Sequence, residues 1–79
     1  MYSSNQILKM EKLCIVLYKE NGLSGAELQE KLKISERTRF RYLEELRSMG
    51  AEVYYEKITN KYRLQKEFSP IQFCRDKIL

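Results

Sequence analysis

The sequence contains no histidine, and this absence removes the commonest general base, the commonest metal ligand and the usual pH switch of proteins. Its two cysteines, Cys14 and Cys74, lack the close paired spacing of a zinc site. We interpret both as ordinary buried thiols. Neither a Gly-rich phosphate loop nor a convergent nucleophile and base is found. The sequence therefore predicts no enzyme, no metal site and no cofactor.

Long hydrophobic runs are missing as well. No apolar stretch approaches the ~18 residues that cross a bilayer, and no secretion signal is recognised, so we expect a cytoplasmic protein without a membrane partner. The 79 residues are 43% hydrophobic and 33% charged, which is typical of one compact domain. A chain this short hides only roughly 60 to 65% of its unfolded surface. We therefore expect no deep cleft, and no small-molecule ligand is evident.

Three helices are predicted in the first fifty residues. Residues 4–20 have helical periodicity, and their second half is apolar almost all round, so another element or a second subunit should cover it. Ser24 and Glu27 form a capping box that starts a helix at Gly25. This second helix breaks at residues 33–34, and Ser35 caps a third helix over 36–49 that ends at Gly50. A short break between two helices is typical of a helix-turn-helix.

The period of the hydrophobic pattern changes from 3.6 to 2 after Glu52. Residues 52–65 are therefore predicted to form a β-hairpin, with its turn over 57–61 and Asn60 at positive φ. We expect Tyr55 and Tyr62 on its buried side and Tyr54 outside, while core packing is the better explanation of Tyr18. Farther on, proline at a helix start and two phenylalanines placed as a hydrophobic staple predict a last helix over 70–78.

Together these elements predict an α+β, mainly helical fold. It is a winged helix-turn-helix, in which three helices form the core and the hairpin is the wing, followed by a short C-terminal helix. We assign residues 1–67 to the winged helix-turn-helix domain. Residues 68–79 form a C-terminal helical extension that is either packed on the domain or used in dimerisation.

Ordered motifs on successive elements carry a family resemblance over residues 5–65. They are Leu23 to Leu28, Lys33 to Thr38, Arg41, Leu43 to Leu46, Gly50, and Tyr62 to Leu64. This pattern resembles the winged helix-turn-helix domain at the amino terminus of bacterial transcriptional regulators of the DeoR type and the WYL-domain type, and more distantly that of the biotin repressor. The family usually has an aliphatic residue in place of Arg39 and an aspartate in place of Tyr42. We expect Phe40 and Tyr42 to supply the lost apolar area while Arg39 extends outward along them.

Positive charge is concentrated at the start of the third helix. The net charge is +4, and Arg37, Arg39 and Arg41 precede Glu44 and Glu45. This order opposes the helix macrodipole and costs about 0.3 to 1 kcal/mol for each badly placed charge. An anionic partner at that end of the helix turns the same arrangement into attraction. The charge order therefore indicates a nucleic-acid partner.

The expected DNA contacts lie on three elements. Arg37 and Arg41 share an outward face of the helix and are expected to contact guanine edges or phosphates, while Thr38 contacts a phosphate or a thymine methyl group. Serines at the two helix starts anchor the DNA backbone, and basic residues of the wing straddle the neighbouring phosphates or enter the minor groove. The full set of expected contacts is Ser24, Ser35, Arg37, Thr38, Arg39, Arg41, Lys57, Lys61 and Arg63.

The sequence thus predicts sequence-specific binding of double-stranded DNA by a bacterial transcriptional regulator or by its DNA-reading domain. Helix 36–49 is expected in the major groove and wing 52–65 on the flanking backbone. The alternative is a winged-helix module for protein–protein interaction that does not bind DNA. A homodimer through helix 4–20 or through the C-terminal helix is left open, as is the question whether the chain is complete or part of a longer regulator.

Overall fold

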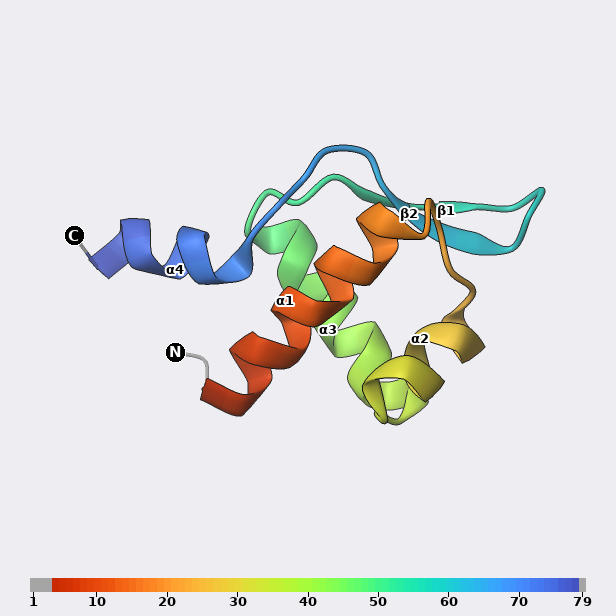
Figure 1. Cartoon of the computed structure of the whole chain (residues 1–79), viewed down its shortest axis with the longest axis horizontal. Helices are drawn as coiled ribbons and strands as arrows, with labels where there is room; N and C mark the ends of the chain where they lie inside the picture. Colours follow the sequence, from red (N-terminus) through yellow and green to blue (C-terminus); the bar gives the residue numbers. More distant parts are fainter. Residues whose placement is uncertain (1–3, 79) are drawn as a thin grey trace.

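The computed structural model describes residues 4–78, which contain four helices and one antiparallel hairpin (Figure 1). In chain order these are α1 (Ser4–Lys19), α2 (Gly25–Leu32), α3 (Glu36–Ser48), β1 (Val53–Glu56), β2 (Lys61–Leu64) and α4 (Pro70–Ile78). The predicted winged helix-turn-helix with a short C-terminal helix is confirmed. Residues 1–3 of the predicted domain 1–67 and residue 79 of the predicted extension 68–79 lie outside the described residues. None of the described helices is long and apolar enough to span a membrane.

The ends of the helices follow the local signals in the sequence. After α1 the chain turns through Asn21 and Gly22, both at positive φ, and the Gly22 N–H donates to the Leu17 carbonyl at 3.1 Å. After α3, Gly50 adopts a φ of 101°, a conformation that favours glycine because a Cβ atom is strained there. The predicted helix stop at Gly50 is therefore confirmed.

The hydrophobic core lies among α1, α2, α3 and the inner face of the hairpin. Helical spacing places four side chains of α1 on one buried stripe, against which α2 and α3 pack. The core side chains that are fully excluded from solvent are Met10, Leu13, Leu17, Leu28 and Leu46. This small core fixes the relative positions of the two helices of the helix-turn-helix.

The hairpin pairs β1 with β2 so that Tyr55 lies opposite Tyr62. An isolated bridge joins Tyr62 to Leu23, whose N–H and carbonyl both bond to the Tyr62 backbone at 3.0 and 2.7 Å. The wing is therefore attached to the segment that leads into α2. At its tip Asn60 has the predicted positive φ of 57°, and its side-chain oxygen accepts a hydrogen bond from the Tyr55 hydroxyl at 2.9 Å.

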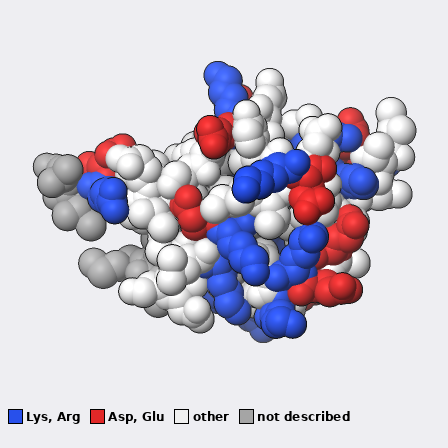
Figure 2. Space-filling model, viewed as in Figure 1, with Lys and Arg blue, Asp and Glu red and all other residues white. Residues whose placement is uncertain are grey.

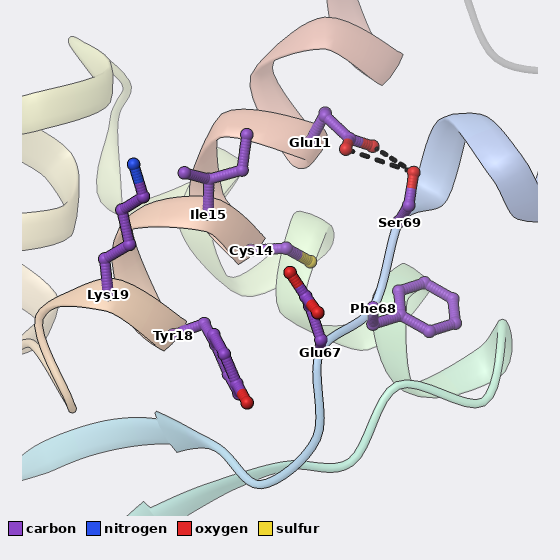
Figure 3. Close-up of a pocket in the computed structure, with 8 residues that line it drawn as sticks. All are labelled: Glu11, Cys14, Ile15, Tyr18, Lys19, Glu67, Phe68 and Ser69. Atoms are coloured by element: carbon purple, nitrogen blue, oxygen red, sulfur yellow. Dashed lines mark hydrogen bonds between the residues drawn. The ribbon is translucent and has the colours of Figure 1, made fainter.

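α4 packs on α1 through a cap that comes from α1 itself (Figure 3). The Glu11 carboxylate accepts hydrogen bonds from the Ser69 hydroxyl at 2.9 and 3.0 Å and from the Ile71 N–H at 3.0 Å. The rings of Phe68 and Phe73 contact each other with centroids 6.1 Å apart, as the predicted staple requires. Between α1 and residues 67–69 remains a pocket of about 450 Å³ that the sequence did not reveal.

Several predicted core positions are wrong. Tyr42 is buried as expected, but Phe40 is 51% exposed and does not replace lost apolar area. Tyr55 is as exposed as Tyr54, at 43%, because the two-stranded wing has no layer that covers it beyond Tyr62. Tyr18 is half exposed and lines the pocket, so α4 covers only part of the apolar surface of α1. Cys14 is buried, whereas Cys74 is only half-buried.

Candidate nucleic-acid interface

A complete capping box starts α2. The Ser24 hydroxyl accepts from the Glu27 N–H at 3.1 Å, and the Glu27 carboxylate accepts from the Ser24 N–H at 2.9 Å. The bond from the Ser24 backbone lowers the pKa of Glu27 below its ordinary value. α2 ends at Lys33, which adopts the left-handed conformation with a φ of 54°. This left-handed conformation of Lys33 turns the chain from α2 toward α3, and the lysine side chain is exposed.

The start of α3 is fixed in the same way. Ser35 accepts from the Thr38 N–H at 3.2 Å and donates its hydroxyl proton to the Thr38 hydroxyl at 3.1 Å. Thr38 is half-buried. Both serines of the predicted site are therefore helix caps, which hold the leading ends of α2 and α3 in place.

Two arginines project from the first half of α3. Arg37 and Arg41 are exposed, four residues apart, and neither forms an ion pair with any residue between 4 and 78. The Arg41 guanidinium carbon lies 5.8 Å from the centre of the Tyr42 ring. In Figure 2, Lys and Arg side chains gather in the lower centre of the face, over the helices, with acidic side chains along their right edge. The start of α3 therefore presents cations whose charge is not neutralised within the described residues.

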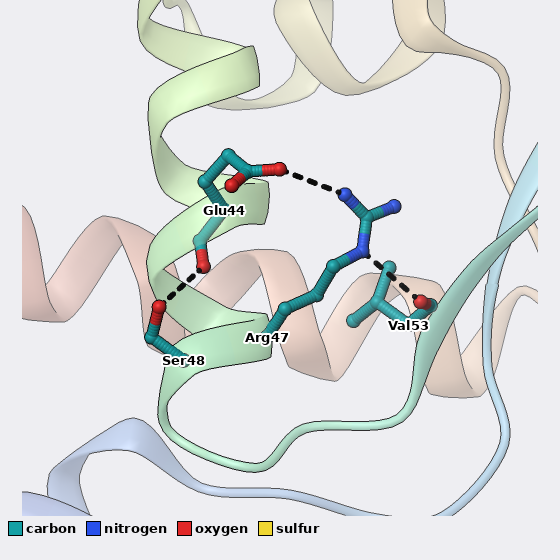
Figure 4. A network of polar contacts seen from close by, with 4 residues as sticks. All are labelled: Glu44, Arg47, Ser48 and Val53. Carbon is teal, nitrogen blue, oxygen red and sulfur yellow. Dashed lines mark hydrogen bonds and ion pairs between the residues drawn. The ribbon is translucent and has the colours of Figure 1, made fainter.

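The last turns of α3 are tied to the wing (Figure 4). Arg47 donates to the Val53 carbonyl at 3.3 Å and pairs with Glu44 at 3.4 Å, while the Ser48 hydroxyl donates to the Glu44 carbonyl at 3.1 Å. The ion pair with Arg47 partly neutralises the charge of Glu44. The two contacts of Arg47 join the end of α3 to the first strand of the wing.

The order of these elements agrees with a known family. A family model described as an HTH domain matches residues 4–58, more than half of the chain. The chain belongs to this family of helix-turn-helix DNA-binding domains. No curated protein and no solved structure matches it. The HTH domain is a DNA-binding family and not a catalytic one, so membership in it points to DNA as the partner. The likeness to DeoR-type and WYL-domain regulators stays a prediction.

The prediction that the Arg39 side chain extends outward along Phe40 and Tyr42 is wrong. Instead of extending outward, its guanidinium turns back onto α2, where Nη1 donates to the Gln29 side-chain oxygen. Its Cζ atom lies 4.4 Å from the centre of the Phe40 ring. Gln29 is not predicted from the sequence as a partner of Arg39. Gln29 lies four residues after Gly25, so the two residues share the side of α2 that faces Arg39.

Arg63 is also held within the protein. Its Nε donates to the Glu56 carboxylate at 3.0 Å, and Nη1 donates to the Asn21 carbonyl at the end of α1. The bond to Asn21 attaches β2 to the loop before α2, and the bond to Glu56 joins β2 to β1. The same carboxylate accepts from the Thr59 hydroxyl at 2.6 Å, and this bond together with Arg63 lowers the pKa of Glu56. Arg63 therefore stabilises the wing of the HTH domain.

The other two basic residues of the predicted wing contacts differ in exposure. Lys57 is exposed at the start of the turn, while Lys61 is half-buried and close enough to Glu27 to lower the pKa of that carboxyl further. The neighbouring Ile58 is 93% exposed. The exposure of Ile58 is not predicted from the sequence, because the turn is assigned only from Asn60, a residue that tolerates positive φ.

Proposed function

We propose that the chain binds double-stranded DNA sequence-specifically, as a bacterial transcriptional regulator or as the DNA-reading part of one. The observation that carries this proposal is the pair of exposed arginines, Arg37 and Arg41, on the first half of α3. They have no acidic partner among residues 4–78. Phosphate and guanine edges are the groups that arginine binds with two parallel hydrogen bonds. In this proposal α3 lies in the major groove.

The remaining contacts support the same orientation. Ser24 and Ser35 hold the leading ends of α2 and α3 toward the DNA backbone, where positive helix ends meet phosphates. Thr38 lies beside Arg37 and contacts a phosphate or a thymine methyl group. Lys57, at the exposed end of the wing, contacts the flanking backbone, with Lys61 beside it.

The test combines selection of bound sequences from a random duplex pool with a salt titration on the selected duplex. We expect wild-type affinity to fall steeply with salt. The slope of log K against log salt should decrease by about 0.9 for each phosphate that the protein no longer neutralises in Arg37→Ala or Arg41→Ala. If either arginine reads a base, its replacement instead removes ~1 to 3 kcal/mol of discrimination.

A matched control is Arg75→Ala. Arg75 is exposed on α4, at the end of the molecule opposite the α2–α3 turn (Figure 1). The control should leave both slope and preference unchanged. Equal slopes and equal preference in wild type, Arg37→Ala and Arg41→Ala contradict the assignment of α3 as the recognition helix. Absence of duplex binding by the wild type leaves the protein-interaction module as the better interpretation.

We also propose that the exposed apolar stripe of α1 pairs with a second copy of the chain. Leu8 and Ile15 are exposed and two helical turns apart, and Glu11 and Lys12 lie between them. In an antiparallel pair of α1 helices whose twofold axis passes between Glu11 and Lys12, Leu8 meets Ile15 of the second copy. A two-fold dimer extends the bound site to two half-sites.

Sedimentation at micromolar concentration tests the pairing. We expect a dimer for the wild type and a monomer for Ile15→Glu, because a buried charge without a partner opposes association. Ile58→Glu places the same charge on the wing and is the matched control, which should remain dimeric. A monomeric wild type at this concentration overturns the pairing and leaves the DNA-binding proposal intact.

A further inference from the structure

Arg39 lies at the junction of α2, α3 and the wing. From α3 its guanidinium reaches the Gln29 side chain on α2, and its Cζ atom is 4.4 Å from the centre of the Phe40 ring and 5.8 Å from that of Tyr62 on β2. One planar group therefore contacts both helices of the helix-turn-helix and faces the wing. The other two arginines at the start of α3 make no such contact with α2.

Gly25 makes room for this guanidinium. A Cβ atom on Gly25 would lie 2.6 Å from Cζ and 3.2 Å from Nε of Arg39, and closer still to Nη1. Gly25 is the first residue of α2 and is not among the glycines with positive φ, so the backbone does not require glycine there. Because all the atoms in close approach belong to the end of the flexible Arg39 side chain, an alanine at position 25 would displace this guanidinium rather than the backbone.

Stability alone does not account for an arginine at position 39. Its Nε is buried without a hydrogen-bond partner, and no carboxylate of residues 4–78 forms an ion pair with it. The cation also lies close to the starts of both α2 and α3, where the helix dipoles disfavour positive charge. Each feature opposes folding. An unbranched apolar side chain of similar length fills the same space without these costs.

We infer that Arg39 is a positioning residue that sets the orientation of α3 relative to α2 and the wing, rather than a DNA contact; this inference rests on the proposed function. Arg37, Thr38 and Arg41 lie within two residues of Arg39 on the same helix. A change in the packing of Arg39 against Gly25 and Gln29 therefore displaces these three side chains together. Because base recognition depends on sub-ångström placement, such a displacement reduces discrimination while leaving the charge of the recognition surface in place.

The experiment uses the whole chain and three single variants, Arg39→Met, Arg39→Lys and Gly25→Ala. Methionine keeps the length of the side chain, lysine keeps its charge but lacks the planar fork, and alanine at position 25 displaces an arginine that is still present. Each protein is measured at a temperature where circular dichroism shows that it is folded. Two quantities are compared with wild type: the ratio of affinities for the selected duplex and for random duplex, and the salt slope of binding.

We expect each variant to lower the affinity ratio about tenfold, comparable to the removal of one base contact, with the salt slope unchanged. Gly25→Ala combined with Arg39→Met should be no worse than the poorer single variant, because both remove the same contact. Arg75→Met serves as the matched control and should behave as wild type. Unfolding temperatures should change little in Arg39→Met, since removal of a buried, unpaired donor offsets the missing hydrogen bond.

Two results overturn the inference. A salt slope reduced by about 0.9 in Arg39→Met, but not in Arg39→Lys, identifies Arg39 as a phosphate contact. An unchanged affinity ratio in all three variants means that the contact serves folding only. A different result shows that the proposed function itself is wrong: the wild type then has no preference for any duplex. In that case the role of Arg39 in positioning α3 for DNA is wrong as well.

Discussion

Replacing Glu11 by alanine tests how α4 is held on the domain. Pro70, the first residue of α4, has no N–H, so the Ile71 and Gln72 N–H groups are the first that need partners outside the helix. Gln72 receives its acceptor from Ser69 at 3.1 Å, within the same segment. Ile71 receives its acceptor from Glu11, sixty residues earlier in the chain. Glu11 therefore completes the cap and also joins α4 to α1.

The magnitude follows from these bonds. A hydrogen bond to a charged group contributes about 1.5 to 3 kcal/mol when buried, and a carboxylate at a helix start adds about 0.3 to 1 kcal/mol. Because Glu11 is only half-buried, we expect Glu11→Ala to lower the free energy of unfolding by about 1 to 2 kcal/mol. For a domain of this size each kcal/mol lowers the unfolding temperature by roughly 4 to 8 °C.

Thermal unfolding followed by circular dichroism measures the destabilisation, and amide hydrogen exchange of residues 71–76 locates it. Glu11→Gln keeps one acceptor oxygen and removes the charge, so its unfolding temperature should lie between those of wild type and Glu11→Ala. An alanine variant with wild-type unfolding temperature and wild-type protection of α4 refutes the reasoning, because the cap then contributes nothing to the docking of the helix.

Three further outcomes are expected. Burial and the nearby Glu11 carboxylate raise the pKa of Cys14 to about 12, so mass spectrometry after alkylation at pH 8 should show Cys74 modified well before Cys14, and equal rates contradict this. Hydrogen bonding to the Ser24 backbone lowers the pKa of Glu27 from its ordinary value of 4.5. The capping box therefore adds stability above pH 4.5, and this stability is lost as the pH falls through the lowered pKa. In Glu27→Gln this part of the acid dependence of unfolding should disappear. Leu28 is fully buried, and Leu28→Ala should cost ~2 to 5 kcal/mol in denaturant unfolding, whereas Ala26→Gly on the exposed side of α2 should cost about 1 kcal/mol.

The elements of the fold were predictable because their signals are local. The capping box joins residues three apart, Gly50 needs only its own φ, and Asn60 stands at positive φ in the turn of a hairpin. Such signals depend on a few neighbouring residues, so a linear sequence contains them in full. The bounds of α2 and α3 accordingly agree with the prediction to within one residue.

The packing of side chains was less predictable because it depends on distant residues. Arg39 meets Gln29 ten positions away, Arg63 meets the Asn21 carbonyl forty-two positions away, and no periodicity relates them. The exposure of Phe40 follows from the same cause, since a helical wheel gives the face of a residue but not what lies opposite it. Where helix faces meet obliquely, neighbouring residues on one wheel enter different environments.

Under the proposed function, the internal contacts of Arg39 leave two arginines at the start of α3 to contact DNA. Arg37 and Arg41 remain free and are one helical turn apart, a spacing of about 6 Å between their Cβ atoms. Successive base pairs are about 3.4 Å apart, so two side chains at this spacing address only about two base-pair steps. Discrimination across a longer site then requires further contacts, from the wing at Lys57 or from a second copy of α3. The size of the selected site will therefore distinguish a single bound chain, with a short core and a flanking wing contact, from a pair whose two short cores are about one helical turn of DNA apart.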